Sequence, residues 1–286
     1  MTTDQNTTGG EVFDPFAGIE DLPTITSEQT RVELLDAARR GFVRIRKDFV
    51  QRESAPRGET VLAQLVSGRK ERALDALLTV HALQPILGES PLPLAVWGRL
   101  LGCTPRSAGA ALKVLKSLGV AEISGTRVVP EIVLKRENGD GMPWSDTAES
   151  ERQGRGFFTI PFEFWTTGLI DTLGMPGKAM FLILLKETQD PNAKRRTFVM
   201  ANERAQDWYG ISERTAERGY RQLRDAGILL EKLRLIPSAR HPLGRSEEWH
   251  RALSYPYSSD HREALRLLAQ KAAQGINAPT STKDPA

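Results

Sequence analysis

The chain reads Leu101-Gly102-Cys103-Thr104-Pro105-Arg106-Ser107-Ala108, and 108 residues later it reads Tyr209-Gly210-Ile211-Ser212-Glu213-Arg214-Thr215-Ala216. The match continues from 112–120 to 220–228 at the same offset, and both of these segments end in Gly followed by Val or Ile. A fixed offset over two segments indicates one structural unit that is present twice.

The order of residue types in each copy is that of a helix-turn-helix. The first glycine of each copy can adopt the left-handed conformation that ends a helix, and Thr104 or Ser212 is placed to cap the next helix. Gly119 or Gly227 then ends that second helix. Steps of four and three residues predict its buried face. That face consists of Ala108, Leu112 and Leu115 in copy one and of Ala216, Tyr220 and Leu223 in copy two.

The opposite face of each second helix is left for a partner and carries cations. A recognition helix enters the major groove of DNA by its N-terminal half, so the first residues face base edges and the later ones face phosphates. An Arg there can donate to O6 and N7 of guanine, which is worth about 1–3 kcal/mol of discrimination. The residues expected to contact DNA are Arg106, Lys113 and Lys116 in copy one and Ser212, Glu213, Arg214, Thr215, Glu217, Arg218, Arg221 and Arg224 in copy two.

A simpler interpretation competes with this one. The charged face of copy two is also what a solvated helix looks like when it carries pairs four residues apart, such as Glu217 with Arg221. Copy one offers Gly109 and Ala110 beside its cations, so it is expected to contact the DNA backbone, thymine methyl groups or another protein. The surrounding motif favours DNA for copy two, and the cations of copy one fit phosphate contact best.

β-Branched runs follow both copies, as a winged helix requires. The first predicts a hairpin from Val120 to Leu134 that turns at 124–126, and the second predicts a longer one with its tip at 237–245. We expect Arg240 and Arg245 in that tip to contact DNA. Segments 41–50 and 156–165 also match, at an offset of 115, and predict a short strand that enters each domain and pairs with the wing of that domain.

The predicted fold is mainly α with small β wings, arranged as two tandem winged helix-turn-helix domains. The predicted divisions are a disordered segment (1–28), the first winged helix domain (29–136), a linker (137–155), the second winged helix domain (156–258), a C-terminal helix (259–275) and a disordered tail (276–286). Before the first strand, residues 30–40 predict a helix with Val32, Leu34, Leu35 and Ala38 on its apolar side. Leu265, Leu267, Leu268 and Ala272 suggest that the C-terminal helix docks or mediates a homodimer.

Composition sets limits on the function. The 286 residues have a formal net charge of +3, so a nucleic-acid surface must come from local clustering of cations. The single cysteine, Cys103, excludes an internal disulfide and a zinc cluster built from cysteines. No apolar run approaches the roughly 20 residues that span a bilayer, and the first ten residues lack the pattern of a secretory signal. We expect a cytoplasmic, nucleoid-associated protein that needs no membrane.

Signals of catalysis are weak throughout the sequence. Residues 174–178 resemble a phosphate-binding loop, but Ala179 stands where Mg²⁺ needs Ser or Thr, and we interpret the segment as a helix start. The four histidines are scattered without metal-ligand spacing. We therefore expect no enzyme, no metal and no cofactor.

The repeated pattern at 102–120 and 210–228 resembles that of the bacterial tandem winged helix-turn-helix DNA-binding proteins. This class includes transcriptional regulators and the plasmid replication initiators built from two winged-helix domains. The resemblance covers about 41–135 and 156–257 and implies sequence-specific binding of double-stranded DNA. We favour a regulator of transcription. The alternatives are a plasmid or phage replication initiator that binds origin repeats and a scaffold whose winged helices contact protein.

Overall fold

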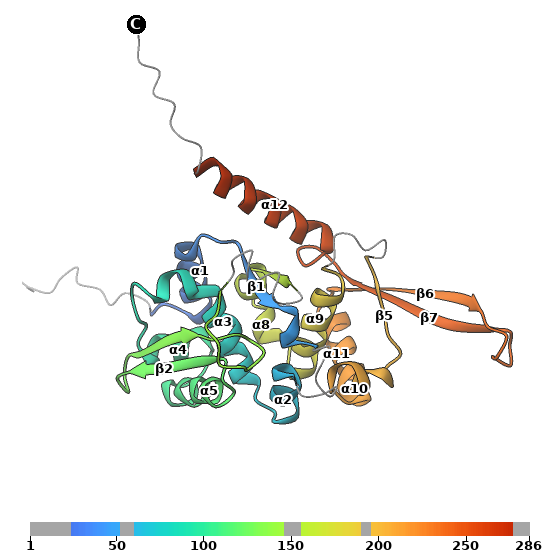
Figure 1. The fold of residues 1–286 in the computed structure, drawn as a ribbon, viewed down its shortest axis with the longest axis horizontal. Helices are drawn as coiled ribbons and strands as arrows, with labels where there is room; N and C mark the ends of the chain where they lie inside the picture. The colour runs from blue at the N-terminus through green and yellow to red at the C-terminus, as the bar shows by residue number, and fades with distance from the viewer. Residues whose placement is uncertain (1–23, 52–59, 146–155, 190–195, 277–286) are drawn as a thin grey trace, which may run out of the picture.

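The protein is described by a computed structural model that covers residues 24–51, 60–145, 156–189 and 196–276. We call residues 24–145 the first half and residues 156–276 the second half. Both halves contain helices together with strands of small antiparallel sheets, so the described chain is a mixed α/β structure (Figure 1).

The elements follow one another in a similar order in the two halves. Those of the first half are α1 (Ser27–Ala38), β1 (Phe42–Arg46), η1 (Lys47–Phe49), α2 (Val61–Ser67), α3 (Glu71–Leu87), α4 (Leu94–Leu100), α5 (Pro105–Ser117), β2 (Ala121–Gly125) and β3 (Pro130–Leu134). Those of the second half are β4 (Phe157–Pro161), α7 (Glu163–Thr166), α8 (Leu169–Thr172), α9 (Met175–Glu187), β5 (Phe198–Val199), α10 (Arg204–Tyr209), α11 (Glu213–Asp225), β6 (Leu229–Pro237), β7 (Arg245–Leu253) and α12 (Ser259–Ile276).

The two lead-in strands pair with each other, and the prediction that each would pair with its own wing is wrong. β1 and β4 run antiparallel, with Phe42 opposite Pro161, Arg46 opposite Phe157 and Arg44 opposite Thr159 in the middle. Arg44 and Thr159 are equivalent positions of the repeat, since their separation is the offset of 115. A local two-fold axis therefore passes through this pair of residues and relates the two strands.

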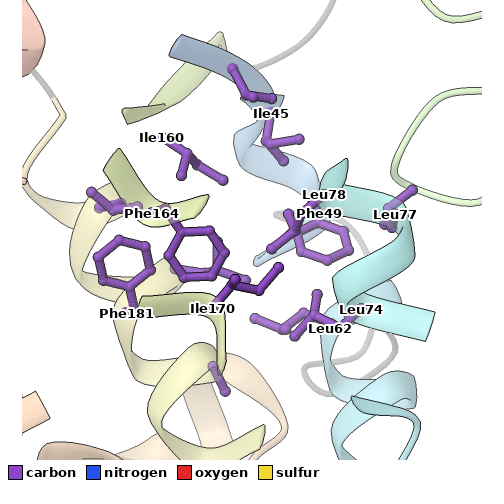
Figure 2. Close-up of a cluster of buried hydrophobic side chains, with 14 of the residues drawn as sticks. Ile45, Phe49, Leu62, Leu74, Leu77, Leu78, Ile160, Phe164, Ile170 and Phe181 are labelled. Atoms are coloured by element: carbon purple, nitrogen blue, oxygen red, sulfur yellow. The ribbon is translucent and has the colours of Figure 1, made fainter. Parts of the chain in front are cut away.

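The two halves share one hydrophobic core. Figure 2 shows Ile45, Phe49 and Leu78 of the first half beside Phe164 and Ile170 of the second. All five side chains are 0–1% exposed. Because this core is continuous across the two halves, the packing of their side chains holds the halves in contact.

Polar contacts cross the same interface. Lys178 at the start of α9 is buried, and its Nζ lies 2.6 Å from Oδ1 of Asp75 on α3. The indole Nε1 of Trp165 donates to Oγ1 of Thr79, 3.1 Å away. Burial raises the pKa of Asp75 to about 6 even though Lys178 acts to lower it. A buried ion pair depends on both partners, so α3 and α9 fix each other's position.

Several boundaries differ from those predicted. α1 begins at Ser27, inside the segment expected to be disordered, because Thr26 and Gln29 form a capping box. Leu35 and Ala38 are buried as predicted, but Val32 is exposed, and the helix buries Arg31 in its place. The first hairpin turns at 126–129 rather than at 124–126, because Gly125 pairs with Pro130. The expectations for 1–23, 146–155 and 277–286 lie outside the described residues.

The start of the predicted linker is part of the core. Glu137 is 0% exposed and accepts from the backbone N–H of Arg46 at 3.2 Å and from Nε1 of Trp144 at 3.2 Å. Its carboxylate also lies 3.9 Å from Nε2 of His81 on α3. Glu137 and Trp144 therefore pack against the body, although 140–143 between them are exposed.

α12 leaves the body after a firm anchor. Arg262 is fully buried and donates to the carbonyl oxygens of Leu185, Thr188 and Tyr257, of which the first two lie at the end of α9 and just after it. The rest of the helix runs away from the other elements (Figure 1), and Leu267 and Leu268 are 50% and 64% exposed. The cap comes from Ser258, whose Oγ accepts from the N–H of His261.

Candidate functional site

The two predicted helix pairs are present with the same local geometry. Gly102 between α4 and α5 has φ of 57°, and Gly210 between α10 and α11 has φ of 68°. The hydroxyl of Thr104 accepts from the backbone N–H of Ser107, three residues further along the chain. Ser212 accepts from Thr215 in the same way, and both distances are 3.2 Å. The predicted turns and caps are confirmed.

The buried faces of α5 and α11 also match position by position. The inward residues are Ala108, Ala111, Leu112 and Leu115 in α5 and Ala216, Gly219, Tyr220 and Leu223 in α11. Each pair of equivalent residues is 108 positions apart. The predicted rotation of both helices is therefore confirmed, and their opposite faces are exposed.

Gly219 is a packing residue that the sequence pattern did not single out. A Cβ at this position would lie 2.4 Å from the carbonyl oxygen of Pro176 and 2.4 Å from Cγ of Met180. The backbones of α11 and α9 therefore approach closely at this crossing. The side chain of Gln222 strengthens it, because its Oε1 accepts from the N–H of Gly177 at 2.8 Å.

The outer face of α11 presents two kinds of arginine. Arg214 and Arg218 are exposed and have no ion pair or hydrogen bond to the part of the chain that the structure describes. Arg221 instead contacts Glu217 at 3.2 Å, as the solvated-helix interpretation expects for that pair. The free arginines lie in the N-terminal part of the helix, next to Glu213.

Arg224 has a structural partner that the sequence did not reveal. Its Nε and Nη2 donate to Oε2 of Glu231 on β6 at 2.9 and 2.7 Å. The other oxygen of Glu231 accepts from Arg251 at 3.1 Å, and the guanidinium of Arg251 stacks 4.1 Å above the ring of Tyr220. Burial acts to raise the pKa of Glu231, but the bonds from Arg224 and Arg251 outweigh it and lower the pKa. Arg224 thus joins α11 to its hairpin.

The surface of α4 and α5 differs in charge from that of α11. Arg106, Lys113 and Lys116 are exposed on α5, and α4 adds the exposed Arg99. Neither helix contains an Asp or Glu. Within α4 and α5 no carboxylate stands between the cations, whereas α11 mixes arginines with carboxylates. We call Arg99, Arg106, Lys113 and Lys116 the α5 surface.

The hairpins differ in length. β6 and β7 are nine residues each and project as a ribbon beyond the body (Figure 1). The tip is closed by a bond from the N–H of Ser238 to the carbonyl of Gly244 at 2.9 Å, and it exposes Arg240 and Arg245. In the shorter first hairpin, the turn exposes Arg127, which the sequence reasoning missed.

One face of the long ribbon carries three exposed apolar side chains, although Glu247 lies opposite Leu235 on the same face. Leu233 stands opposite Trp249, and Leu235 follows on the same side, with exposures of 40, 41 and 49%. These side chains lie beyond the end that α11 covers. Such a stripe is unsuited to contact with phosphates. Among the features of the β6–β7 hairpin, it is the one that most favours a protein partner.

Features typical of other functions are missing from the described ranges. No group of three or more His, Cys, Asp or Glu side chains there could hold a metal ion. Residues 174–178 form the start of α9, as expected, with Lys178 buried in its ion pair. Over residues 24–51, 60–145, 156–189 and 196–276, no helix combines the length and the apolar character needed to span a membrane. No family model, curated protein or solved structure matches this chain.

Proposed function

We propose that the chain is a sequence-specific double-stranded DNA-binding protein that acts as a regulator of transcription. In this proposal α4, α5 and the β2–β3 hairpin make one winged helix-turn-helix, and α10, α11 and the β6–β7 hairpin make the other. α5 and α11 are the recognition helices, and each hairpin is a wing. No catalytic step, metal or cofactor is part of the proposal.

The observation that carries it is that Arg214 and Arg218, at the start of α11, are exposed and have no partner among the residues that the structure describes. A recognition helix reads bases with this part, and a guanidinium that is not engaged within the protein can donate its fork to a guanine. Glu213 and Glu217 repel phosphate and can accept from cytosine. A mixed face of this kind suits the reading of sequence better than uniform coating of the backbone.

The pairing of β1 with β4 supports a site with two parts. A local two-fold axis relates the strands that lead into the two units, and we infer that the units themselves are arranged about this axis, as the subunits of a dimer are. Figure 1 places α5 and α11 towards the same side of the molecule, away from α12. Dimeric helix-turn-helix proteins bind two half-sites about one turn of DNA apart, and we expect a site of that size.

The decisive experiment is selection of binding sites from random duplexes by the full chain. Wild-type protein should enrich a defined motif, and the Arg214→Ala, Arg218→Ala double variant should lose part of it. A matched control is the Lys70→Ala, Lys271→Ala double variant, which removes the same charge from exposed positions outside α11. Loss of enrichment in the control as well would mean that bulk charge, and not α11, drives binding.

The presence of two joined reading units in one chain favours a second candidate, the initiation of plasmid or phage replication. Mapping of bound sites across the genome separates the two candidates, since a regulator occupies promoters and an initiator occupies direct repeats beside an AT-rich segment. A chain that shows no salt-dependent retention on DNA would instead be a scaffold, and the Leu233, Leu235 and Trp249 stripe would be its first candidate contact.

Homodimerisation through α12 remains a proposal as well. It is supported by the exposed Leu267 and Leu268 on a helix that is anchored only at its first turns by Arg262. Sedimentation of the full chain and of the Leu267→Ser, Leu268→Ser variant tests it. A concentration-dependent dimer that the variant loses supports the proposal, and a monomer in both contradicts it.

A further inference from the structure

The charges of the chain are divided between its N-terminus and its body. Residues 1–23 contain five acidic residues, Asp4, Glu11, Asp14, Glu20 and Asp21, and no Lys or Arg. The remaining chain therefore keeps 31 of the 36 Asp and Glu residues and all 39 Lys and Arg residues, which leaves a net charge of +8. The same N-terminal segment contains the large apolar residues Val12, Phe13, Phe16, Ile19 and Leu22.

The α5 surface complements this segment better than any other helical face in the described chain. Its four cations have no carboxylate beside them on α4 or α5, whereas α11 carries Glu213, Glu217 and Asp225. Gly109 and Ala110 have small or no side chains, so we expect room for an apolar side chain beside Arg106 and Lys113. An acidic, apolar segment is therefore repelled by part of α11 and attracted along the whole of α5.

The structure places α1, the helix that this segment precedes, against the end of α4. α1 follows directly after the described residues 24–26, and Arg31, about one turn into α1, donates its Nε to the carbonyl of Leu100 at 2.8 Å. Leu100 ends α4, and α5 begins five residues later at Pro105. Twenty-three residues reach up to about 80 Å when extended, and α5 is only about 20 Å long. A tether this close gives an effective concentration on the order of millimolar.

We propose that residues 1–23 dock on the α5 surface and compete with other polyanions for it. Docking is an electrostatic contact within one chain, and it weakens with salt because the Debye length falls to about 3 Å at 1 M. Docking itself does not depend on the proposed function, but competition with DNA rests on it. The consequence is that the α5 surface is covered until a stronger anion displaces the segment.

The test of docking is carbodiimide cross-linking of the full chain at low salt. This reagent joins a carboxylate to a lysine only when the two are in contact. Peptide mapping of the monomer band should find Glu11, Asp14, Glu20 or Asp21 joined to Lys113 or Lys116. Exposed Lys70, Lys232 and Lys271 are the internal controls. Links that favour Lys113 and Lys116 and vanish at 1 M salt support the proposal. Links spread evenly over all five lysines, or none to α5, overturn it.

A second measurement uses the Glu11→Gln, Asp14→Asn, Glu20→Gln, Asp21→Asn variant of the full chain and a 30-base-pair duplex of random sequence. The variant should bind the duplex at least about threefold more tightly than wild type at low salt, since the competitor is weakened. Equal affinities overturn competition. If neither chain binds DNA, the proposed function fails, while the cross-links still decide whether the segment docks.

Discussion

At the scale of single residues, the charge of Glu137 is linked to folding, because its carboxyl group is buried in the core. Burial raises its pKa to about 7, against hydrogen bonds from the backbone and from Trp144 and the charge of Arg46, all of which act to lower it. A carboxyl group whose pKa is raised on folding stabilises the protein when it is protonated. Its contribution is complete below the unfolded value of about 4.5 and is lost as the pH rises through about 7.

We therefore predict that Glu137→Gln flattens the dependence of stability on pH between 4.5 and 7. The wild type should lose on the order of 3 kcal/mol of unfolding free energy over this interval through Glu137 alone. Urea unfolding at several pH values measures it. Burial lowers the pKa of the neighbouring His81 to about 3, so His81 acts in the opposite direction, destabilising the fold as the pH falls below 6.5. An unchanged slope in the variant would contradict the prediction.

We predict that substitutions of two arginines of α11 have different effects, one on binding and the other on stability. Arg214→Ala is expected to cost about 1–3 kcal/mol of binding and to relax preference at one or two base pairs. Arg224→Ala should instead lower the free energy of unfolding, because it removes two hydrogen bonds to Glu231, and it should affect binding less. Titration of a selected site and urea unfolding of both variants distinguish these outcomes. A stability loss in Arg214→Ala with none in Arg224→Ala would reverse the assignment.

Much of the site was predictable at this scale, and the failures have a common cause. The caps Thr104 and Ser212 and the glycine turns follow from local backbone chemistry, which sequence spacing reports directly. The partner of Arg224 lies seven residues away on a strand, and the close approach at Gly219 depends on Met180 of a different helix. Contacts of this kind depend on the tertiary arrangement, which the spacing of one segment does not contain.

At the scale of elements, the packing of α11 on α9 depends on the missing side chain of Gly219. We predict that Gly219→Ala destabilises the protein by about 1–3 kcal/mol, because the new methyl group meets backbone and cannot be accommodated without moving a helix. Gly109→Ala on α5 is the matched control. Its methyl group would meet only the end of the Leu94 side chain at 3.3 Å, so we expect no loss and a gain of up to about 1 kcal/mol from helix propensity. Equal losses in the two variants would count against the close crossing as the cause.

The tip of the long hairpin allows a test of the wing. Arg240 and Arg245 are exposed and have no core to support, so the double Ala variant should keep its thermal stability. If the tip reaches phosphates or an adjacent minor groove, affinity at moderate salt falls and the salt dependence of binding weakens by up to about two units. Unchanged affinity with unchanged stability would confine the DNA contacts to the helices.

Element boundaries were predicted best where the apolar pattern ends at a Gly or Pro residue. The tip predicted at 237–245 agrees within one residue with the end of β6 at Pro237 and the start of β7 at Arg245. The short elements α2, α7, α8 and β5 were missed, since each is too short to show a period. The apolar spacing of Ala73, Leu74, Leu77 and Leu78 predicts a helix over 70–83, and α3 continues beyond it to Leu87, past Pro85. The lead-in strands were found, but their partners were not.

At the scale of the whole molecule, the shared core predicts one cooperative unfolding transition. Ile45→Ala at the β1–β4 contact should cost about 2–5 kcal/mol and lower the hydrogen-exchange protection of α5 and α11 together. Val32→Ala, at an exposed position of α1, should change neither. Two transitions, or a loss of protection confined to the first half, would mean that the halves fold as separate units.

The antiparallel contact between β1 and β4 has a consequence for orientation. A symmetric dimer looks the same after half a turn, so it sits on a symmetric object in two equivalent ways. Here the strands obey the two-fold axis, but the surfaces they position do not, because α5 is cationic throughout while α11 alternates arginines with carboxylates. Half a turn about the axis therefore gives a different object, and whatever the two surfaces bind together is held with a fixed polarity.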